Sequence, residues 1–269
     1  MLLYHYTKID AVINIIQNGL CFWGFRYDSM NDPTDCIFAK EKILPKLQQS
    51  LPIENRNDYL DIYPYIVSFC KKRDFDIMWR LYQAEVALVI DSDKFPFEEW
   101  NKSGPISEST LFGEVMYATE DAIDSVAKEL YEKRPIILTN ASIDEYQLYV
   151  LPFIKSEAYR VEDEYRLAKV DYNAPSTQYN PKSPDNFDIY EYERPNDIKC
   201  FSSKDGQLRL YKEFQLPKEC LVEIIIHSFD EEKFKIQKKH FELWLLQNGF
   251  SLQDIKIEQT QSYPVRQNH

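Results

Sequence analysis

Glycine is scarce in this chain, and no stretch of the sequence is rich in it. The 269 residues include 6 glycines. Loops that hold phosphate groups with backbone amides depend on closely spaced glycines. The sequence therefore lacks both a P-loop and the glycine-rich turn of the dinucleotide-binding folds, and those two architectures are excluded.

Cysteine and histidine are also few, and their spacing matches no metal site. The 5 cysteines include no Cys-x-x-Cys pair, and the 4 histidines include no His-Glu-x-x-His pattern. Dispersed thiols in odd number are typical of a reducing compartment and not of a disulfide framework. We therefore expect neither a metal ion nor a disulfide.

Positive charge is in deficit as well, because the formal net charge is -12. Broad binding to nucleic acid needs a basic surface that displaces counterions, and this composition argues against it. A local basic groove is still compatible with the composition, since net charge governs solubility and steering more than it governs one cleft.

Long apolar runs and leader-like segments are missing too. No stretch is apolar for long enough to span a bilayer. Met1 leads directly into a strand-like segment, with no basic stretch followed by an apolar one. These features predict a cytoplasmic protein that has no membrane partner.

What the chain does contain is enough apolar sequence for a sizeable core. With 44% hydrophobic residues, we expect a single domain over 1–269. Strand and helix patterns interleave irregularly and without repeats, which favours an α+β fold over a doubly wound α/β fold. Pro, Asn, Ser and Tyr dominate 171–197 without periodicity, and we expect a loop insertion there.

The first twenty residues predict a strand followed by a helix. Residues 1–6 read as a strand, and apolar residues then recur at helical spacing. Thr7 is the expected N-cap, with Asp10 reaching back to it in a capping box. Gly19 supplies the left-handed residue that ends the helix.

Apolar periodicity predicts the remaining elements. Strands are expected at 20–23, 62–70, 86–90, 115–117, 163–170, 208–216, 221–226 and 255–257. Helices are expected at 36–49, 75–82, 119–132, 143–156 and 230–248.

A histidine near the start and two glutamates far downstream are the residues that point most directly to a site. His5 lies within the apolar opening strand, where a core histidine bonded to a backbone carbonyl is the simpler interpretation. Glu162 and Glu164 are expected on one face of a strand, because side chains alternate with a period of two. Arg166 continues that face, so a solvent-facing ion pair with Glu164 is the competing interpretation.

Other polar residues are open to two interpretations. Arg26 precedes a loop containing Asn31, Asp32 and Asp35, which either binds a ligand or stabilises turns. Ser68 is a small hydroxyl on a strand expected to be buried. No Ser-His-Asp or Cys-His signature of a nucleophile is present.

Several short blocks together resemble a known bacterial family. Their order matches the family catalogued as domain of unknown function 2971 over nearly the whole chain. The blocks are Leu3-Tyr4-His5-Tyr6-Thr7, Asn31-Asp32-Pro33, Ser68-Phe69, Trp79 to Tyr82, Glu162-Asp163-Glu164-Tyr165-Arg166 and Ser262-Tyr263-Pro264-Val265-Arg266. The chain departs from the family pattern at Cys70 and Tyr165, where serine and tryptophan are usual, and at Gln83-Ala84-Glu85, where the family tends to have a glycine.

The opening of that family is similar to the opening of ADP-ribosyltransferase-like domains. The resemblance implies a bent, split β-sheet core with an NAD cleft between its halves. It also implies cleavage of NAD as a co-substrate, without a metal, and transfer of ADP-ribose to a protein or nucleic acid acceptor. Phage defence or a toxin system is the setting that it suggests.

The resemblance also assigns roles to individual residues. His5 would hold a ribose hydroxyl of NAD, and Glu164 would stabilise the cation formed as nicotinamide leaves. Glu162 would orient the acceptor. The other residues expected to contact NAD are Tyr6, Thr7, Arg26, Ser68 and Tyr82.

Two alternatives stand beside this hypothesis. The first is a non-catalytic sensor or interaction domain that binds a nucleotide-like ligand in the same cleft. The second is a phage-defence toxin that acts on nucleic acid, which the acidic composition disfavours unless NAD-dependent modification replaces tight binding.

Overall fold

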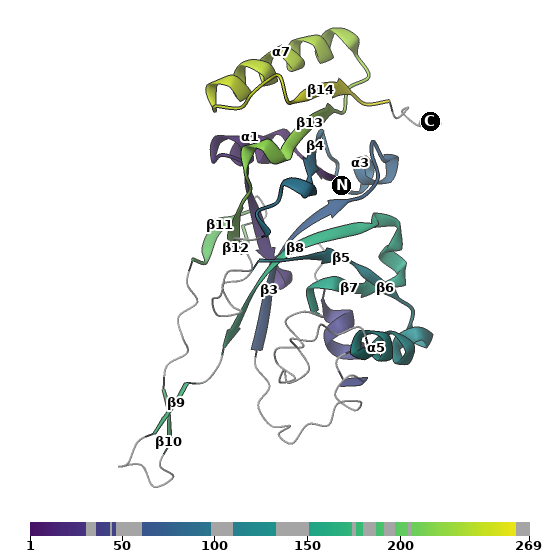
Figure 1. Ribbon diagram of the computed structural model, residues 1–269, viewed down its shortest axis with the longest axis vertical. Coiled ribbons are helices and arrows are strands. Elements are labelled where there is room, and N and C mark those ends of the chain that lie inside the picture. The colour runs from purple at the N-terminus through teal and green to yellow at the C-terminus, as the bar shows by residue number, and fades with distance from the viewer. Residues whose placement is uncertain are drawn as a thin grey trace.

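The fold combines one large sheet with two small ones and several helices (Figure 1). The computed structural model describes residues 1–30, 36–43, 45–46, 61–97, 110–132, 151–173, 176–179, 187–190, 197–203 and 206–261. Strands of the large sheet are β1 (Leu2–Thr7), β2 (Cys21–Arg26), β3 (Asp61–Cys70), β4 (Val86–Asp91), β5 (Leu111–Glu114), β8 (Glu164–Asn173), β11 (Lys199–Ser202), β12 (Leu208–Gln215), β13 (Leu221–Ile226) and β14 (Lys256–Gln259).

The small sheets and the helices surround this sheet. β6 (Met116–Ala118) pairs in parallel with β7 (Ile154–Ser156), and β9 (Ser176–Tyr179) pairs antiparallel with β10 (Phe187–Tyr190). The α-helices are α1 (Ile9–Gln17), α3 (Asp76–Leu81), α5 (Ile123–Glu132) and α7 (Glu231–Gln247). Shorter helical turns are η1 (Tyr27–Ser29), η2 (Ala39–Ile43), η3 (Ser92–Lys94), η5 (Glu120–Ala122), η7 (Leu151–Phe153), η8 (Glu157–Glu162) and η9 (Lys218–Cys220).

The large sheet is open and mostly antiparallel. Its main path runs β11-β12-β2-β3-β1-β4-β13-β14, and β8 joins it by pairing with both β3 and β5. Only the pairing of β13 with β14 is parallel among these described strands. This arrangement agrees with the expected mixture of helices and strands and with the absence of a doubly wound parallel sheet.

Strand β3 has one edge filled by a single partner and the other edge shared by two. All ten of its residues, Asp61 to Cys70, pair with β8. On the opposite edge, Tyr65 and Ile66 pair with β2, whereas Cys70 pairs with β1. Because a strand has only two edges for hydrogen bonding, β1 and β2 must leave β3 at different points. The sheet therefore opens between β1 and β2.

Strand β4 lies in the centre of the core, as its continuous apolar sequence predicts. Residues 86–90 are fully buried, and the strand pairs with β1 on one side and β13 on the other. Val12 and Ile16 of α1 belong to the same hydrophobic cluster, together with Leu245 of α7. Elements from both ends of the chain thus share one core.

Most predicted elements are confirmed to within a few residues. These are the strands expected at 20–23, 62–70, 86–90, 115–117, 163–170, 208–216, 221–226 and 255–257, and the helices expected near 9–19, 75–82, 119–132 and 230–248. The helix expected at 36–49 is helical over 37–43, and part of it lies outside the described residues. The polar loop at 31–35, the linker at 51–60 and the segment at 262–266 also lie outside them.

The predicted cap of the first helix is wrong. Thr7 is the last residue of β1, and Lys8 is the N-cap, without a capping hydrogen bond from its side chain. Instead, the amide of Ile9 donates to Glu85 Oε2 at 3.0 Å. The pairing of Thr7 with Val86 extends β1 by one residue and brings this glutamate to the helix end.

The helix predicted at 143–156 is also wrong over its described part. Residues 151–156 form η7 and then β7, because Pro152 lacks the amide that a helix interior needs. Residues 143–150 lie outside the described residues.

The loop predicted at 171–197 contains strands. β8 continues to Asn173, and the hairpin of β9 and β10 follows at the lower left of Figure 1. Strand β8 extends past residue 170 because its backbone continues to pair with β3 as far as Asp61. Backbone pairing does not require an apolar side-chain pattern.

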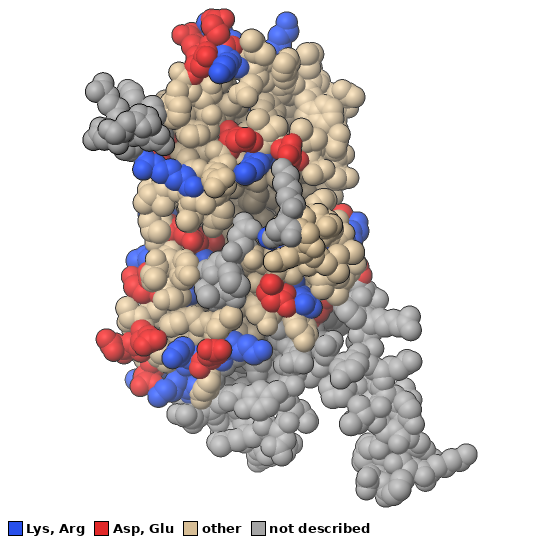
Figure 2. All heavy atoms as spheres, turned by 180° about the vertical axis from the view of Figure 1, so that it is seen from behind, with Lys and Arg blue, Asp and Glu red and all other residues tan. Residues whose placement is uncertain are grey.

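The surface seen in Figure 2 carries acidic and basic side chains interspersed, without one broad basic area on that face. Within the described ranges, no helix is both long and apolar enough to cross a bilayer.

We expect Glu85→Ala to lower the free energy of unfolding by about 1 kcal/mol, since it removes the acceptor for an N-terminal amide of α1 and a favourable charge near it. Thr7→Val is the control and should change stability by less than about 0.5 kcal/mol. Urea unfolding followed by circular dichroism measures both. A larger loss from Thr7→Val would show that the hydroxyl caps the helix after all.

Candidate functional site

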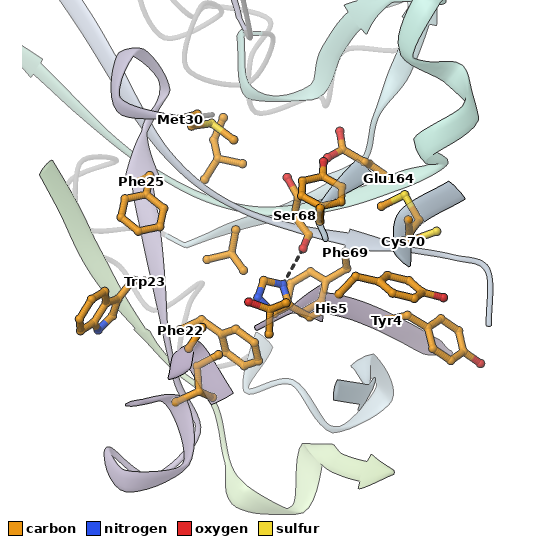
Figure 3. Close-up of a pocket in the computed structure, with 18 of the residues that line it drawn as sticks. Tyr4, His5, Phe22, Trp23, Phe25, Met30, Ser68, Phe69, Cys70 and Glu164 are labelled. Carbon is orange, nitrogen blue, oxygen red and sulfur yellow. Dashed lines mark hydrogen bonds between the residues drawn. The ribbon is translucent and has the colours of Figure 1, made fainter. Parts of the chain in front are cut away.

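A cavity of about 720 Å³ opens where β1 and β2 leave β3. Its volume is in the range of small-molecule and cofactor sites. Seven of the eight residues predicted from the sequence line it: His5, Tyr6, Thr7, Ser68, Tyr82, Glu162 and Glu164. Figure 3 shows His5 and Ser68 near the middle of the view, between Trp23 and Phe25 on one side and Glu164 and Cys70 on the other.

His5 is held in place by the open edge of β3. Its Nδ1 lies 3.0 Å from the carbonyl oxygen of Ser68, between the points where β2 and β1 pair with β3. The ring also packs edge-on against Phe22, with centroids 5.1 Å apart, and against Phe69. The side chain therefore replaces a strand neighbour at the opening of the sheet.

The protonation state of His5 follows from these contacts. A carbonyl oxygen only accepts, so Nδ1 must carry the hydrogen. Burial lowers the pKa of His5 below its usual range, because it disfavours the charged imidazole. The ring is then neutral at physiological pH, and Nε2 holds a lone pair that can accept a hydrogen bond from a ligand hydroxyl.

Ser68 contributes an unsatisfied polar atom to the cavity. Its Oγ is buried and has no hydrogen-bond partner among the described residues. Buried hydroxyls are normally bonded, because the loss of hydration costs free energy when nothing replaces it. A polar ligand group in the cavity would satisfy this atom.

Four charged side chains form a buried cluster at one end of the cavity. Lys155 Nζ lies 2.8 Å from Glu162 Oε2 and 3.4 Å from Glu164 Oε2. Arg166 Nη2 lies 2.9 Å from the same oxygen of Glu164, and its Nη1 donates to the carbonyl of Pro152. All four are 5% exposed or less, so the two carboxylates and the two cations neutralise each other in a desolvated setting.

The two glutamates reach this cluster by a route that the sequence does not predict. Glu162 is the last residue of η8 and not a strand residue, and Asp163 adopts a left-handed conformation, with φ 48°. Glu164 then begins β8, and its amide donates to the hydroxyl of Tyr117. The turn at Asp163 brings the two side chains together, whereas strand alternation was the expected cause.

The predicted solvent-facing pair of Glu164 and Arg166 is wrong in its location. The ion pair exists, but Arg166 is fully buried and Glu164 is 2% exposed. Arg166 lies opposite Ser68 in the pairing of β3 with β8, and Gly113 of β5 pairs with it from the other edge. The carbonyl of Pro152 and the side chain of Lys155 lie against this pair, so groups on the face of β8 cover it.

Burial changes the acid–base properties of Glu162. Desolvation raises its pKa most, the nearby charge of Glu164 raises it further, and Lys155 lowers it. Cys70 also lines the cavity, and burial raises its pKa to about 11. Its thiol therefore stays protonated at neutral pH, which disfavours a role as nucleophile.

Tyr6 lines the cavity but uses its hydroxyl structurally. The hydroxyl donates to the carbonyl of Lys72 at 2.7 Å and accepts from the amide of Phe75 at 2.9 Å. Its ring meets Trp79 edge-on, with centroids 4.8 Å apart. These contacts fasten the loop before α3, the helix that ends beside Tyr82 at the cavity wall.

Arg26 is the predicted site residue that the structure leaves out of the cavity wall. Its side chain forms two hydrogen bonds with Asp28 at 2.7 Å and lies over the ring of Tyr63. Arg26 is the last residue of β2, and its guanidinium is held by Asp28 instead of facing the cavity that Trp23 and Phe25 line.

Sequence reasoning missed several residues of the wall. Lys155 fell within the wrongly predicted helix, so nothing linked it to the glutamates. Trp23 and Phe25 alternate in a strand, a pattern that is equally common in cores. Phe201 and Arg209 meet only through the pairing of β11 with β12, and no local signal indicates that contact.

Comparison of the chain with models of known protein families, with curated proteins and with solved structures found no match. Within the described part of the chain, no group of three or more His, Cys, Asp or Glu side chains is arranged to hold a metal ion.

We expect Lys155→Met to destabilise the protein by about 3–5 kcal/mol, because two buried carboxylates would then share the single cation Arg166. Adding Glu162→Gln to this variant should recover part of the loss. Lys71→Met is the matched control, since its pairs with Glu114 and Asp163 are at the surface and contribute about 0–1 kcal/mol. Urea unfolding is the measurement. Equal effects of the two lysine variants would mean that the cluster is hydrated.

Stability should also fall as the pH falls below about 6.5, the ordinary pKa of histidine. The unfolded imidazole of His5 binds a proton there, whereas the folded one, with its lowered pKa, does not until the pH is lower. His5→Asn keeps an N–H donor and should weaken this decline. Urea midpoints between pH 5 and pH 8 test it. His227, whose pKa burial also lowers, is present in both proteins, so the difference between them reports His5. Identical slopes would contradict the expectation.

Proposed function

We propose that this cavity binds NAD and that the protein cleaves the bond between nicotinamide and ribose, passing ADP-ribose to an acceptor. The carrying observation is that a neutral histidine with an accepting Nε2 and a buried glutamate line one cavity from separate strands. The resemblance to domain of unknown function 2971 and to ADP-ribosyltransferase-like domains assigns these two residues the same roles.

The shape of the sheet also supports this proposal. An ADP-ribosyltransferase-like core has a split, bent sheet with NAD between its halves. Here β1 and β2 diverge along one edge of β3, and the cavity lies at their divergence. A ligand at that point would contact both arms of the sheet, as the proposed fold requires.

The chemistry needs charge stabilisation and exclusion of water. As nicotinamide departs with the bonding electron pair, the ribose carbon becomes cationic, and the Glu164 carboxylate stabilises that charge. His5 Nε2 accepts a hydrogen bond from a ribose hydroxyl and holds the sugar in place. The acceptor atom then bonds to the ribose carbon and loses its proton to Glu162, whose raised pKa makes it a better base.

The acceptor in this proposal is a protein or a nucleic acid in the cytoplasm, in phage defence or a toxin system. A net charge of -12 and the mixed surface charges of Figure 2 favour a protein, or a nucleic acid modified without tight binding.

One observation favours a second candidate, a sensor that binds a nucleotide without cleaving it. Glu164 pairs with both Arg166 and Lys155. A carboxylate already neutralised by two cations stabilises a developing positive charge less than an unpaired one does. Nucleotide binding at His5 and Ser68 would be unaffected by this neutralisation.

Nicotinamide release by the wild type separates the two candidates, and Glu164→Gln tests the role proposed for this carboxylate. We expect it to lower the rate of nicotinamide release on the order of 10²–10³-fold, because it keeps the side-chain size and removes the stabilising charge. Purified protein, NAD and a cell extract that supplies acceptors make up the assay.

Glu114→Gln is the control, since Glu114 is an exposed glutamate that pairs with Lys71. Circular dichroism checks that both variants fold. If wild type binds NAD and never releases nicotinamide with any acceptor, the sensor candidate replaces the enzyme. Failure to bind NAD at all would remove both.

A further inference from the structure

The cavity has a second end, lined by aromatic side chains that the proposed chemistry does not use. Trp23 and Phe25 of β2 and Phe201 of β11 line it. All three are half-buried, whereas the core aromatics Phe22 and Phe69 beside them are 1% exposed. Rings that only filled the core would be covered to the same extent, whereas these three keep part of their surface exposed and line the cavity.

The aromatic rings at this end are fixed by their neighbours. Trp23 stacks on Tyr211, with centroids 4.4 Å apart and ring planes 25° apart. Phe201 lies 5.7 Å from Trp23 and 5.6 Å from Phe25. The pairing of β11, β12 and β2 places these side chains on one face of the sheet, and Tyr211 is buried there. The surface they present is therefore preorganised, which reduces the entropy lost on binding.

A positive charge accompanies the aromatic rings. Arg209 lines the same end and is the cross-strand partner of Phe201. Aromatic faces beside a guanidinium match a ligand that has both a planar base and a phosphate, through stacking and charge. An apolar ligand would use the rings but not the charge.

We propose that Trp23, Phe25 and Phe201 form the subsite for the base of a purine nucleotide, with Arg209 next to its phosphates. This rests on the proposed function in that the nucleotide is the adenylate half of NAD. The base stacks at the aromatic end, the chain of the dinucleotide passes His5, and the nicotinamide ribose reaches Glu164. Figure 3 shows Trp23 and Phe25 on the opposite side of His5 from Glu164, as this orientation requires.

Two substrates with the same scissile bond test the subsite. Nicotinamide riboside has the bond between nicotinamide and ribose but lacks adenine and phosphates. We expect Trp23→Ala to raise KM for NAD about tenfold or more and to leave the riboside unaffected. Phe229→Ala is the control, because Phe229 is an exposed aromatic outside the cavity. An equal effect of Trp23→Ala on both substrates would overturn the proposal.

A binding measurement makes the test independent of catalysis. AMP and ADP-ribose should quench tryptophan fluorescence in wild type and in Trp244→Phe, whereas Trp23→Phe should lose the signal. If AMP quenches Trp23 and NAD is never cleaved, the purine subsite stands and the proposed enzyme falls. If NAD is cleaved and Trp23→Phe keeps the full quenching, the subsite is wrong and the enzyme stands.

Discussion

The site depends on the way in which three strands compete for the two edges of β3. Strand β8 occupies one edge completely, so β1 and β2 divide the other. A carbonyl between them is left for a side chain, and His5 takes it with the N–H of its neutral ring. The same geometry opens the cavity and fixes the histidine tautomer. It also places Ser68 in the cavity wall. The carbonyl oxygen of Ser68 bonds to His5, and its hydroxyl has no hydrogen-bond partner among the described residues.

The charged cluster orients the side chains at the other end of the cavity, but its burial is costly in free energy. Removing four charged groups from water is costly, and their mutual attraction offsets that cost only while all the partners remain in place. Lys155 and Arg166 hold Glu164 firmly, which is useful for orientation. They also reduce the charge that it offers to a ligand. The balance between these effects would decide between the two proposed functions, catalysis and nucleotide binding alone.

Much of the fold was predictable from local pattern. The run at 86–90 is apolar throughout and is the buried central strand, and the periodicity of 9–16 marks α1. Failures arose where a distant residue or one proline decided the outcome. Glu85, and not Thr7, accepts from the first turn of α1, because the pairing of β1 with β4 brings it there. Pro152 ended a helix pattern that apolar spacing alone had favoured.

The sequence by itself pointed to most of the polar residues that line the cavity, because a histidine within an apolar strand and two glutamates beside an arginine stand out from their surroundings. It did not determine how they meet. The left-handed turn at Asp163 and the contacts of Lys155 with both glutamates join residues close together in the sequence, but they depend on the break between η8 and β8, which apolar spacing does not mark. The aromatic end built from β2 and β11 comes from contacts between residues far apart in the chain. Such contacts follow from the edges that strands share in the folded sheet, and periodicity within a single segment contains no information about them.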